Sequence, residues 1–221
     1  TPQSIVAIYA ADLDGDRDVD IATAHADGNF QVHLDYVYVF LNNGYGALSQ
    51  PATYPLDGDP RSIAGADLNG DGTMDLVADA KTSFGTGGAD RIVVFLNQGN
   101  GTFSSGTGYD APAGCCYVAT ADFDQDEHID LVAVSQVSNM LSFFSNYGDG
   151  TFVSQKDYPV EGSPETLYPG DFDRDGDMDL AIALSMANRV AILLNGGRQH
   201  LEYPRLELSA QKLDFGEVLI G

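Results

Sequence analysis

One nine-residue acidic pattern occurs four times in this sequence and constrains the fold more than any other feature. The copies are DLDGDRDVD at 12–20, DLNGDGTMD at 67–75, DFDQDEHID at 122–130 and DFDRDGDMD at 171–179. Their first residues are separated by 55, 55 and 49 positions. Regular spacing of this length is typical of a chain built from repeated structural units. We therefore expect four copies of one unit.

Other landmarks keep the same spacing and indicate four short strands in each unit. One apolar run precedes each acidic pattern and another follows it, as in VDIATA and MDLVADA. A third run ends in an asparagine and a fourth ends near a tyrosine, with a glycine turn such as GNGTF between them. The asparagines are Asn42, Asn97, Asn146 and Asn195, and the tyrosines are Tyr54, Tyr109, Tyr158 and Tyr203. Helical periodicity is absent.

Four strands in about 50 residues is the size of one β-propeller blade. The predicted fold is all-β, with four four-stranded antiparallel blades in a partial or unusually small propeller, followed by a C-terminal β segment. The repeats would cover residues 1–57, 58–112, 113–161 and 162–204. A strand solenoid is the competing architecture, but its turns are usually only about 20 to 30 residues long.

The acidic patterns have the ligand spacing of a calcium loop. Carboxylates at positions 1, 3, 5 and 9, with a backbone carbonyl at position 7, can surround a hard cation that takes about six to eight oxygen ligands. The start of each pattern is similar to an EF-hand loop, but the glutamate at position 12 is missing, so position 9 has to close the site. Zinc would need His or Cys, and magnesium demands near-ideal octahedral geometry. We expect about four Ca²⁺, one in each repeat.

The candidate ligands occupy positions 1, 3, 5, 7 and 9 of each loop. They are Asp12, Asp14, Asp16, Asp18 and Asp20; Asp67, Asn69, Asp71, Thr73 and Asp75; Asp122, Asp124, Asp126, His128 and Asp130; and Asp171, Asp173, Asp175, Asp177 and Asp179. Position 6 favours glycine, which Gly72 and Gly176 provide, whereas Arg17 and Glu127 predict weaker binding at the first and third sites. Without a cation, the like charges should loosen each loop.

Composition narrows the classes of function. The formal net charge is −23 with only ten Lys and Arg, which argues against nucleic acid or an anionic membrane as partner. No apolar run is long enough to insert into a bilayer. Thr1 is not followed by the charged and apolar regions of a signal peptide, so we expect that such a peptide is absent or already removed.

Catalytic motifs are missing as well. No GxSxG, HExxH, CxxC or Walker pattern occurs, and the four histidines are scattered, so we expect a protein that is not an enzyme. The two cysteines, Cys115 and Cys116, are adjacent. They are either two small apolar residues at the start of a strand, or a vicinal or intermolecular disulfide in an oxidising compartment.

The acidic loop, the DLVV-like strand after it and the FLNxGxGTF hairpin together resemble the FG-GAP/VCBS repeat family. Blades of this family build the heads of integrin α-subunits and many secreted bacterial proteins. The likeness covers residues 1 to about 204. It implies calcium between the first and second strands of each blade, an extracellular or cell-surface location, and a role in adhesion or ligand binding.

Family propellers usually have seven blades, and four copies supply about half of such a ring. Three arrangements remain open: part of a seven-bladed propeller, a closed four-bladed ring, or a ring completed by another subunit. The C-terminal residues 205–221, RLELSAQKLDFGEVLIG, resemble the first strands of an immunoglobulin-like domain of the ASH or choice-of-anchor type. They are either the start of such a domain or a strand donated to a neighbouring copy, which would build a filament.

The leading hypothesis is an extracellular calcium-binding repeat protein that acts as an adhesive or structural scaffold, such as a surface or filament subunit. Its partner would be a protein or glycan outside the cell. The alternative is a lectin-like propeller that binds glycans, because a fungal lectin group uses similar blades. Candidate sugar-binding residues are Asn29, Phe30, Tyr36 and Phe84. A calcium-dependent polysaccharide lyase is a third hypothesis.

Overall fold

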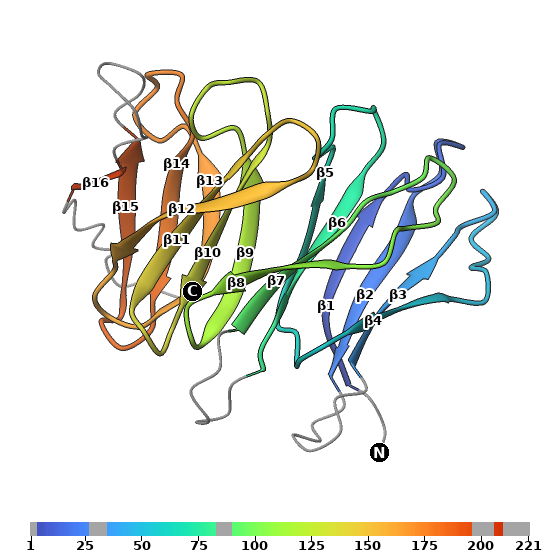
Figure 1. Ribbon diagram of the computed structural model, residues 1–221, viewed down its shortest axis with the longest axis horizontal. Helices are drawn as coiled ribbons and strands as arrows, with labels where there is room; N and C mark the ends of the chain where they lie inside the picture. The colour runs from blue at the N-terminus through green and yellow to red at the C-terminus, as the bar shows by residue number, and fades with distance from the viewer. Residues whose placement is uncertain (1–3, 27–34, 83–89, 196–205, 210–221) are drawn as a thin grey trace, which may run out of the picture.

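The computed structural model describes residues 4–26, 35–82, 90–195 and 206–209, and within these ranges the protein is entirely β (Figure 1). Sixteen strands form four separate four-stranded sheets. All pairings are antiparallel, and each sheet keeps its strands in sequence order. The all-β propeller-blade architecture expected from the repeats is thus confirmed.

The four sheets are named blades 1 to 4 in chain order. Blade 1 contains β1 (Ser4–Ala11), β2 (Asp20–Ala26), β3 (Asp35–Phe40) and β4 (Ala52–Leu56). Blade 2 contains β5 (Ile63–Ala66), β6 (Asp75–Ala80), β7 (Asp90–Phe95) and β8 (Thr107–Ala111). Blade 3 contains β9 (Cys115–Ala121), β10 (Asp130–Ser135), β11 (Met140–Asn146) and β12 (Phe152–Pro159). Blade 4 contains β13 (Pro164–Gly170), β14 (Asp179–Leu184), β15 (Arg189–Asn195) and β16 (Leu206–Ser209).

The last strand differs from the expectation. The sequence predicts that the fourth repeat ends at residue 204 and that residues 205–221 form a separate segment. In the structure, Leu206–Ser209 pairs with β15 and completes blade 4. The fourth repeat lacks the glycine hairpin that positions the outer strand in the other repeats, so the next alternating segment occupies the sheet edge. Residues 210–221 lie outside the described ranges, and an immunoglobulin-like domain there stays a prediction.

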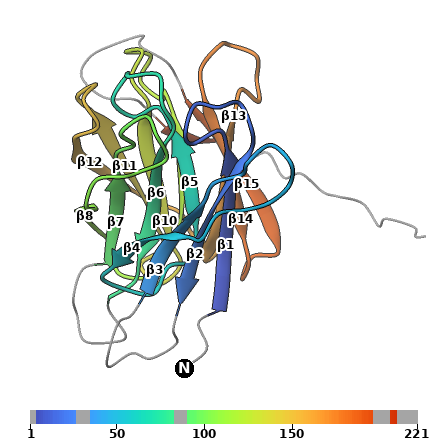
Figure 2. The ribbon, with the colours of Figure 1, turned by 90° about the vertical axis from the view of Figure 1, so that its right-hand side faces the viewer.

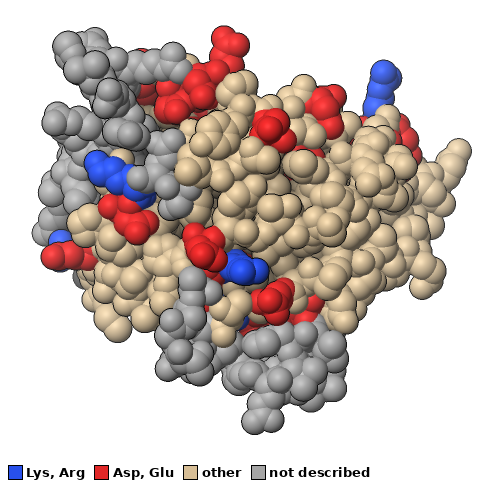
Figure 3. Space-filling model, in the orientation of Figure 1, with Lys and Arg blue, Asp and Glu red and all other residues tan. Residues whose placement is uncertain are grey.

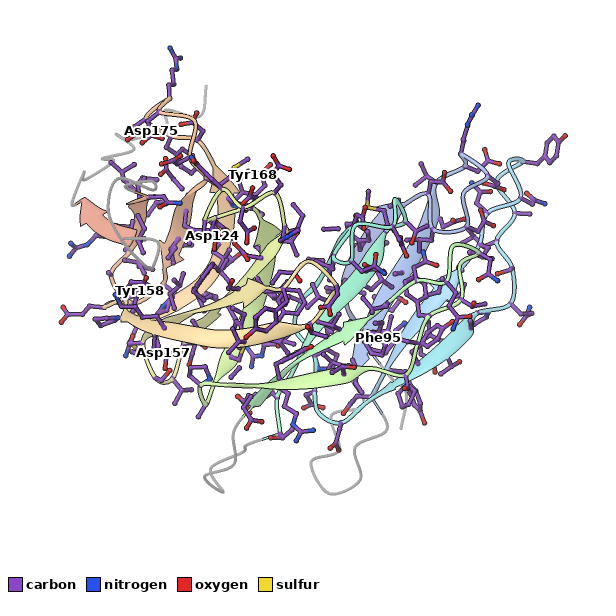
Figure 4. All side chains as sticks on the ribbon, turned by 45° about the horizontal axis from the view of Figure 1, so that its top comes forward. Phe95, Asp124, Asp157, Tyr158, Tyr168 and Asp175 are labelled. Atoms are coloured by element: carbon purple, nitrogen blue, oxygen red, sulfur yellow. The ribbon has the colours of Figure 1, made fainter. Side chains whose placement is uncertain are left out.

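The blades stack face to face, with a layer of apolar side chains between each pair. Phe95 lies between blades 1 and 2, Phe144 between blades 2 and 3, and Phe143 between blades 3 and 4. Adjacent residues of one strand therefore face different neighbours, as strand geometry requires. The second strands of blades 2 and 3 are buried at every position because a blade covers each of their faces. Figure 4 labels Phe95 in its layer.

The blades form an open arc. Their first strands, β1, β5, β9 and β13, lie side by side in that order, and blades 1 and 4 are at the two ends (Figures 1 and 2). The sheets do not close, so the closed four-bladed ring among the three predicted arrangements is excluded for the described residues. Within the same ranges, no helix has the length and apolarity needed to span a membrane.

Candidate metal sites

Each acidic loop connects the first and second strands of its blade, so all four lie along one rim of the arc (Figure 1). Acidic side chains gather along the same edge in the space-filling view (Figure 3). Figure 4 turns this rim toward the viewer and places Asp124 and Asp175 on neighbouring blades. The repeat thus concentrates negative charge in a row of loops with the same design.

The aspartate at position 9 is the buried anchor of each loop. In blade 3, Asp130 is fully buried and its Oδ2 accepts a hydrogen bond from the Phe123 N–H at 3.1 Å. Its Oδ1 accepts from the N–H of Asn146 at 2.9 Å. Asp20, Asp75 and Asp179 make the same two contacts in the other blades. Position 9 therefore ties the start of the loop to the end of the third strand.

The aspartate at position 1 organises the turn itself. Asp12 accepts from the N–H of Gly15 at 2.8 Å and from the N–H of Arg17 at 2.9 Å. Its counterparts in the other three loops also accept two backbone N–H groups each. The carboxylate at position 5 accepts from the N–H at position 7, as Asp126 does from His128 at 2.9 Å. These local bonds hold the chain in a compact loop.

Carboxylates at positions 1, 3 and 9 come together in three of the loops. In each group, one ligand atom per residue lies within 4.8 Å of the others. The groups are Asp12, Asp14 and Asp20; Asp122, Asp124 and Asp130; and Asp171, Asp173 and Asp179. In the second loop Asn69 stands at position 3, and its Nδ2 donates to Asp71 Oδ2 at 2.9 Å. The aspartates at position 5 are not members of the three groups.

The crowding of negative charge shifts several pKa values. Burial raises the pKa of Asp130 to about 7, and the charges of Asp124 and Asp126 act in the same direction. Burial likewise raises the pKa of Asp14, with added repulsion from Asp20 and Asp16. Each loop therefore holds more negative charge than its surroundings neutralise, which a bound cation would correct.

The donor set fits Ca²⁺. The groups that converge are carboxylate oxygens, the ligands that a hard cation prefers, and neither cysteine nor histidine belongs to the three groups. Positions 1, 3 and 9 would provide the side-chain ligands in the first, third and fourth loops, and Asp67, Asn69 and Asp75 would do so in the second. A bound ion would supply the positive charge that these oxygens lack.

Backbone strain distinguishes the four loops. Position 6 has a positive φ in every loop, as the sequence predicted, and position 4 has one as well. Glycine occupies both positions in the second loop and one of them in the first and fourth. In the third loop both are other residues, Gln125 at φ 58° and Glu127 at φ 71°. The third loop is thus the most strained of the four.

The repeated asparagines were landmarks in the sequence with no predicted role, but three of them, Asn97, Asn146 and Asn195, join neighbouring blades. Asn97 donates from Nδ2 to the carbonyl of Met74 in its own blade at 2.9 Å and to that of Leu13 in blade 1 at 2.8 Å. Asn146 bonds Leu68 of blade 2, and Asn195 bonds Phe123 of blade 3. The acceptor is always the residue at position 2 of the preceding acidic loop.

The repeated tyrosines form a second connection between blades. The Tyr54 hydroxyl accepts from the N–H of Phe103 in the next blade at 3.0 Å, and the two ring centroids are 5.5 Å apart. Tyr109 makes the same contact with Phe152, at 3.3 Å between the atoms and 5.6 Å between the rings. The constant spacing from asparagine to tyrosine in the first three repeats was the signal that could have revealed this role.

The structure does not test the predicted sugar-binding role of four residues or the predicted state of the two cysteines. Asn29, Phe30 and Phe84 lie outside the described residues. Tyr36 lies on β3, where its ring is 5.8 Å from that of Tyr38. Cys115 is buried at the start of β9, and the side chain of Cys116 is not among those described, so the redox state of the pair stays open.

Comparisons with known proteins give a consistent fold. BBS1N, in a structure of its complex with ARL6DN soaked with lead, is 11% identical with a TM-score of 0.54, and the match covers 87% of this chain and 52% of that one. A variant of the Aleuria aurantia lectin, in complex with Fucalpha1-6GlcNAc, is 7% identical with a TM-score of 0.53, covering 92% and 62%. This chain therefore spans between half and two thirds of those proteins. No curated protein matches the sequence.

A family profile is more specific. The profile described as FG-GAP-like repeat matches residues 12–78 and 122–182, which is more than half of the chain and includes all four acidic loops. The matched segments contain the asparagine and the tyrosine of both the first and the third repeat. The chain therefore belongs to the FG-GAP-like repeat family.

Proposed function

We propose that this protein is an extracellular calcium-binding scaffold with an adhesive or structural role, and that it works without catalysis. The observation that carries the proposal is the row of loops with converging carboxylates along one rim. The partner would be a protein or glycan outside the cell, where millimolar Ca²⁺ would keep weak sites occupied. Secretion, cell adhesion and a place in a surface filament are parts of the same proposal.

Calcium would act on the whole arc through contacts already described. A ligand carboxylate such as Asp130 also accepts the N–H of Asn146, and the side chain of Asn146 reaches blade 2. An ion that fixes the carboxylate would thus fix the asparagine and the joint between blades. This coupling fits a scaffold, whose task is to hold a shape.

The test is a calorimetric titration of chelator-stripped protein with Ca²⁺. We expect about four ions per chain and a rise in melting temperature of roughly 10 °C at saturation, which corresponds to several kcal/mol for a chain of this size. A parallel titration with Mg²⁺ should give much weaker binding. Absence of Ca²⁺ uptake, together with a melting temperature that ignores chelator, would refute the proposal.

A further inference from the structure

Blade 1 exposes a face that is covered in the other blades. Ile63, Val118 and Leu167 occupy the same strand position as Ile8 and are buried against the preceding blade. Ile8 is 64% exposed. Ile21, which pairs with Ala10 of β1, and Phe40, which pairs with Ile21, are on the same face as Ile8 by strand alternation, and both are only partly buried. Among the described residues, no sheet lies on this surface, which we call the blade 1 face.

The residues that join a blade to the preceding blade are also present in blade 1, but among the described residues they have no preceding blade to contact. Asn42 donates from Nδ2 to Val19 of its own blade, at 3.2 Å, and has no acceptor from a preceding blade in the described part of the chain. Leu48 takes the place of Phe103 and Phe152 in the hairpin but is 47% exposed, since no tyrosine lies on it. A Cβ added at Gly46 would meet nothing within 4 Å, whereas a Cβ added at the equivalent Gly101 would lie 2.6 Å from Leu41 of the preceding blade.

Blade 4 carries the complementary half of the same joint. Phe172 stands at position 2 of its loop, where Leu13, Leu68 and Phe123 are buried under the next blade, yet it is 46% exposed. Tyr168, labelled in Figure 4, is 73% exposed. Its counterpart Tyr9 donates from its hydroxyl to the carbonyl of Gly65 in the next blade at 3.2 Å. We call this surface the blade 4 face.

We propose that the blade 1 face of one copy binds the blade 4 face of a second copy, head to tail. The chain already makes the same contact between consecutive blades three times, between blades 1 and 2, 2 and 3, and 3 and 4. The blade 1 face carries the residues of one side of this contact, and the blade 4 face carries those of the other side. Ala10 stands on the blade 1 face at the position of Gly65, where an added Cβ would lie 2.5 Å from the Tyr9 ring, so the ring of Tyr168 would have to shift to make room for the methyl group of Ala10. The residues named on both faces are uncharged, so no like charges meet directly in the contact.

Another occupant of the blade 1 face would be a carbohydrate. The rings of Tyr36, Tyr38 and Phe40 follow one another along β3, with centroids 5.8 and 6.5 Å apart. A row of this kind can stack on sugars. It does not explain why Asn42, Gly46 and Leu48 reproduce a blade joint, whereas a second copy explains all of these residues together.

Analytical ultracentrifugation in Ca²⁺ and about 150 mM NaCl tests the proposal. The salt shortens the Debye length to about 8 Å, which screens the repulsion between the acidic copies. The wild-type protein should associate with rising concentration. Ile8→Asp blocks the blade 1 face, and Tyr168→Asp blocks the blade 4 face, because each would bury an unpaired charge in the contact. Each variant alone should associate at least about 100-fold more weakly than the wild type. An equal mixture of the two should form a dimer, because each supplies the face that the other lacks.

Val137→Asp is the matched control, since Val137 is 69% exposed and lies in the turn between β10 and β11, away from both faces. It should associate like the wild type. A wild-type protein that stays monomeric, with or without a soluble polysaccharide bound to it, overturns the proposal. So does a mixture that stays monomeric, or association of either single variant at wild-type strength. Circular dichroism checks that each variant is folded before its result is counted.

Discussion

At the scale of single residues, the most consequential side chains are the asparagines that end the third strands. A buried amide that donates to two carbonyls, one in each of two blades, satisfies polar backbone groups that water cannot reach. Its loss would leave both acceptors without a partner. The chain also contains an internal reference, since the side-chain amide of Asn42 donates, among the described residues, only to a carbonyl of its own blade.

Asn146→Ala should lower the free energy of unfolding by about 2 to 4 kcal/mol, because the buried carbonyls of Leu68 and Ile129 each lose a donor. Asn42→Ala, in a partly exposed position, should cost about 1 kcal/mol or less. Urea denaturation of both variants in saturating Ca²⁺ measures the difference. Equal losses would mean that the contact between blades contributes nothing.

Glycine at the left-handed positions of the third acidic loop should stabilise the protein. Gln125→Gly and Glu127→Gly each relieve a left-handed residue and should raise the free energy of unfolding by about 0.5 to 1 kcal/mol. Gly72→Ala is the reverse control, because φ is 87° and an added Cβ would meet nothing within 4 Å. It should cost about 1 kcal/mol through backbone conformation alone. Thermal denaturation of the three variants reports the signs, and a loss of stability on adding glycine would contradict the assignment of strain.

Asp79 gives the protein a stability that depends on pH. Its Oδ1 accepts from the N–H groups of Arg61 and Ser62 and from the Ser62 hydroxyl, but its buried Oδ2 has no hydrogen-bond partner in the described residues. Burial raises the pKa of Asp79 to about 6, above the value of about 4 in an unfolded chain. Between these values the folded chain holds a proton that the unfolded chain has released, so stability falls as pH rises.

The comparison of wild type with Asp79→Asn isolates this effect. In chelator-stripped protein, the difference between their free energies of unfolding should change by about 2 kcal/mol between pH 4 and pH 6.5, with the variant gaining as pH rises. Below about pH 3 the aspartate is protonated in both states and the difference should be constant. Denaturation curves whose difference does not change with pH would show that Asp79 is ionised at no cost.

At the scale of elements, the acidic loop was the part most readily predicted. Its register of aspartates follows from the ligand geometry of a cation, and the positive φ at position 6 follows from the tightness of the turn. The positive φ at position 4 was missed, although Gly15 and Gly70 stand there, because Gln125 and Arg174 conceal the pattern. The joints formed by Asn97 and Tyr54 were missed because each partner is far away in the sequence, and spacing alone cannot show which atoms meet.

Removal of one ligand should remove one ion. Asp124→Ala takes a carboxylate from the group that contains Asp122 and Asp130, and the calorimetric stoichiometry should fall by one relative to the wild type. Asp149→Ala is the control, because Asp149 is an exposed hairpin residue whose Oδ1 accepts from the N–H of Thr151 at 3.0 Å. It should leave the stoichiometry unchanged. The same loss in both variants would assign the effect to net charge and not to the loop.

At the scale of the whole molecule, the sequence predicted the number of blades and their strand order. It did not predict whether the blades close into a ring. Four copies fix four sheets, whereas ring closure depends on faces that meet only in three dimensions. The formal charge of −23 acts at this scale too. Four Ca²⁺ carry eight positive charges and would bring it to about −15, which lowers the repulsion that opposes a compact fold.

The melting temperature of chelator-stripped protein should therefore rise with salt. Between about 20 mM and 500 mM NaCl we expect an increase of about 4 °C or more, since the Debye length falls from roughly 20 Å to about 4 Å. The Ca²⁺-saturated protein should gain less than half as much. Differential scanning calorimetry of the two forms at the same series of NaCl concentrations measures both increases. An equal gain in the two forms would show that the loops are not the main source of repulsion.

The bonds from the amides of Asn97, Asn146 and Asn195 to carbonyls in the acidic loops of neighbouring blades also have a mechanical meaning. A force that pulls on the two ends of the arc would act on these bonds one after another, and the weakest would yield first. If ions occupy the loops as proposed, each one stiffens the point at which the force passes from blade to blade. The resistance of the molecule to stretching would then follow the calcium concentration around it.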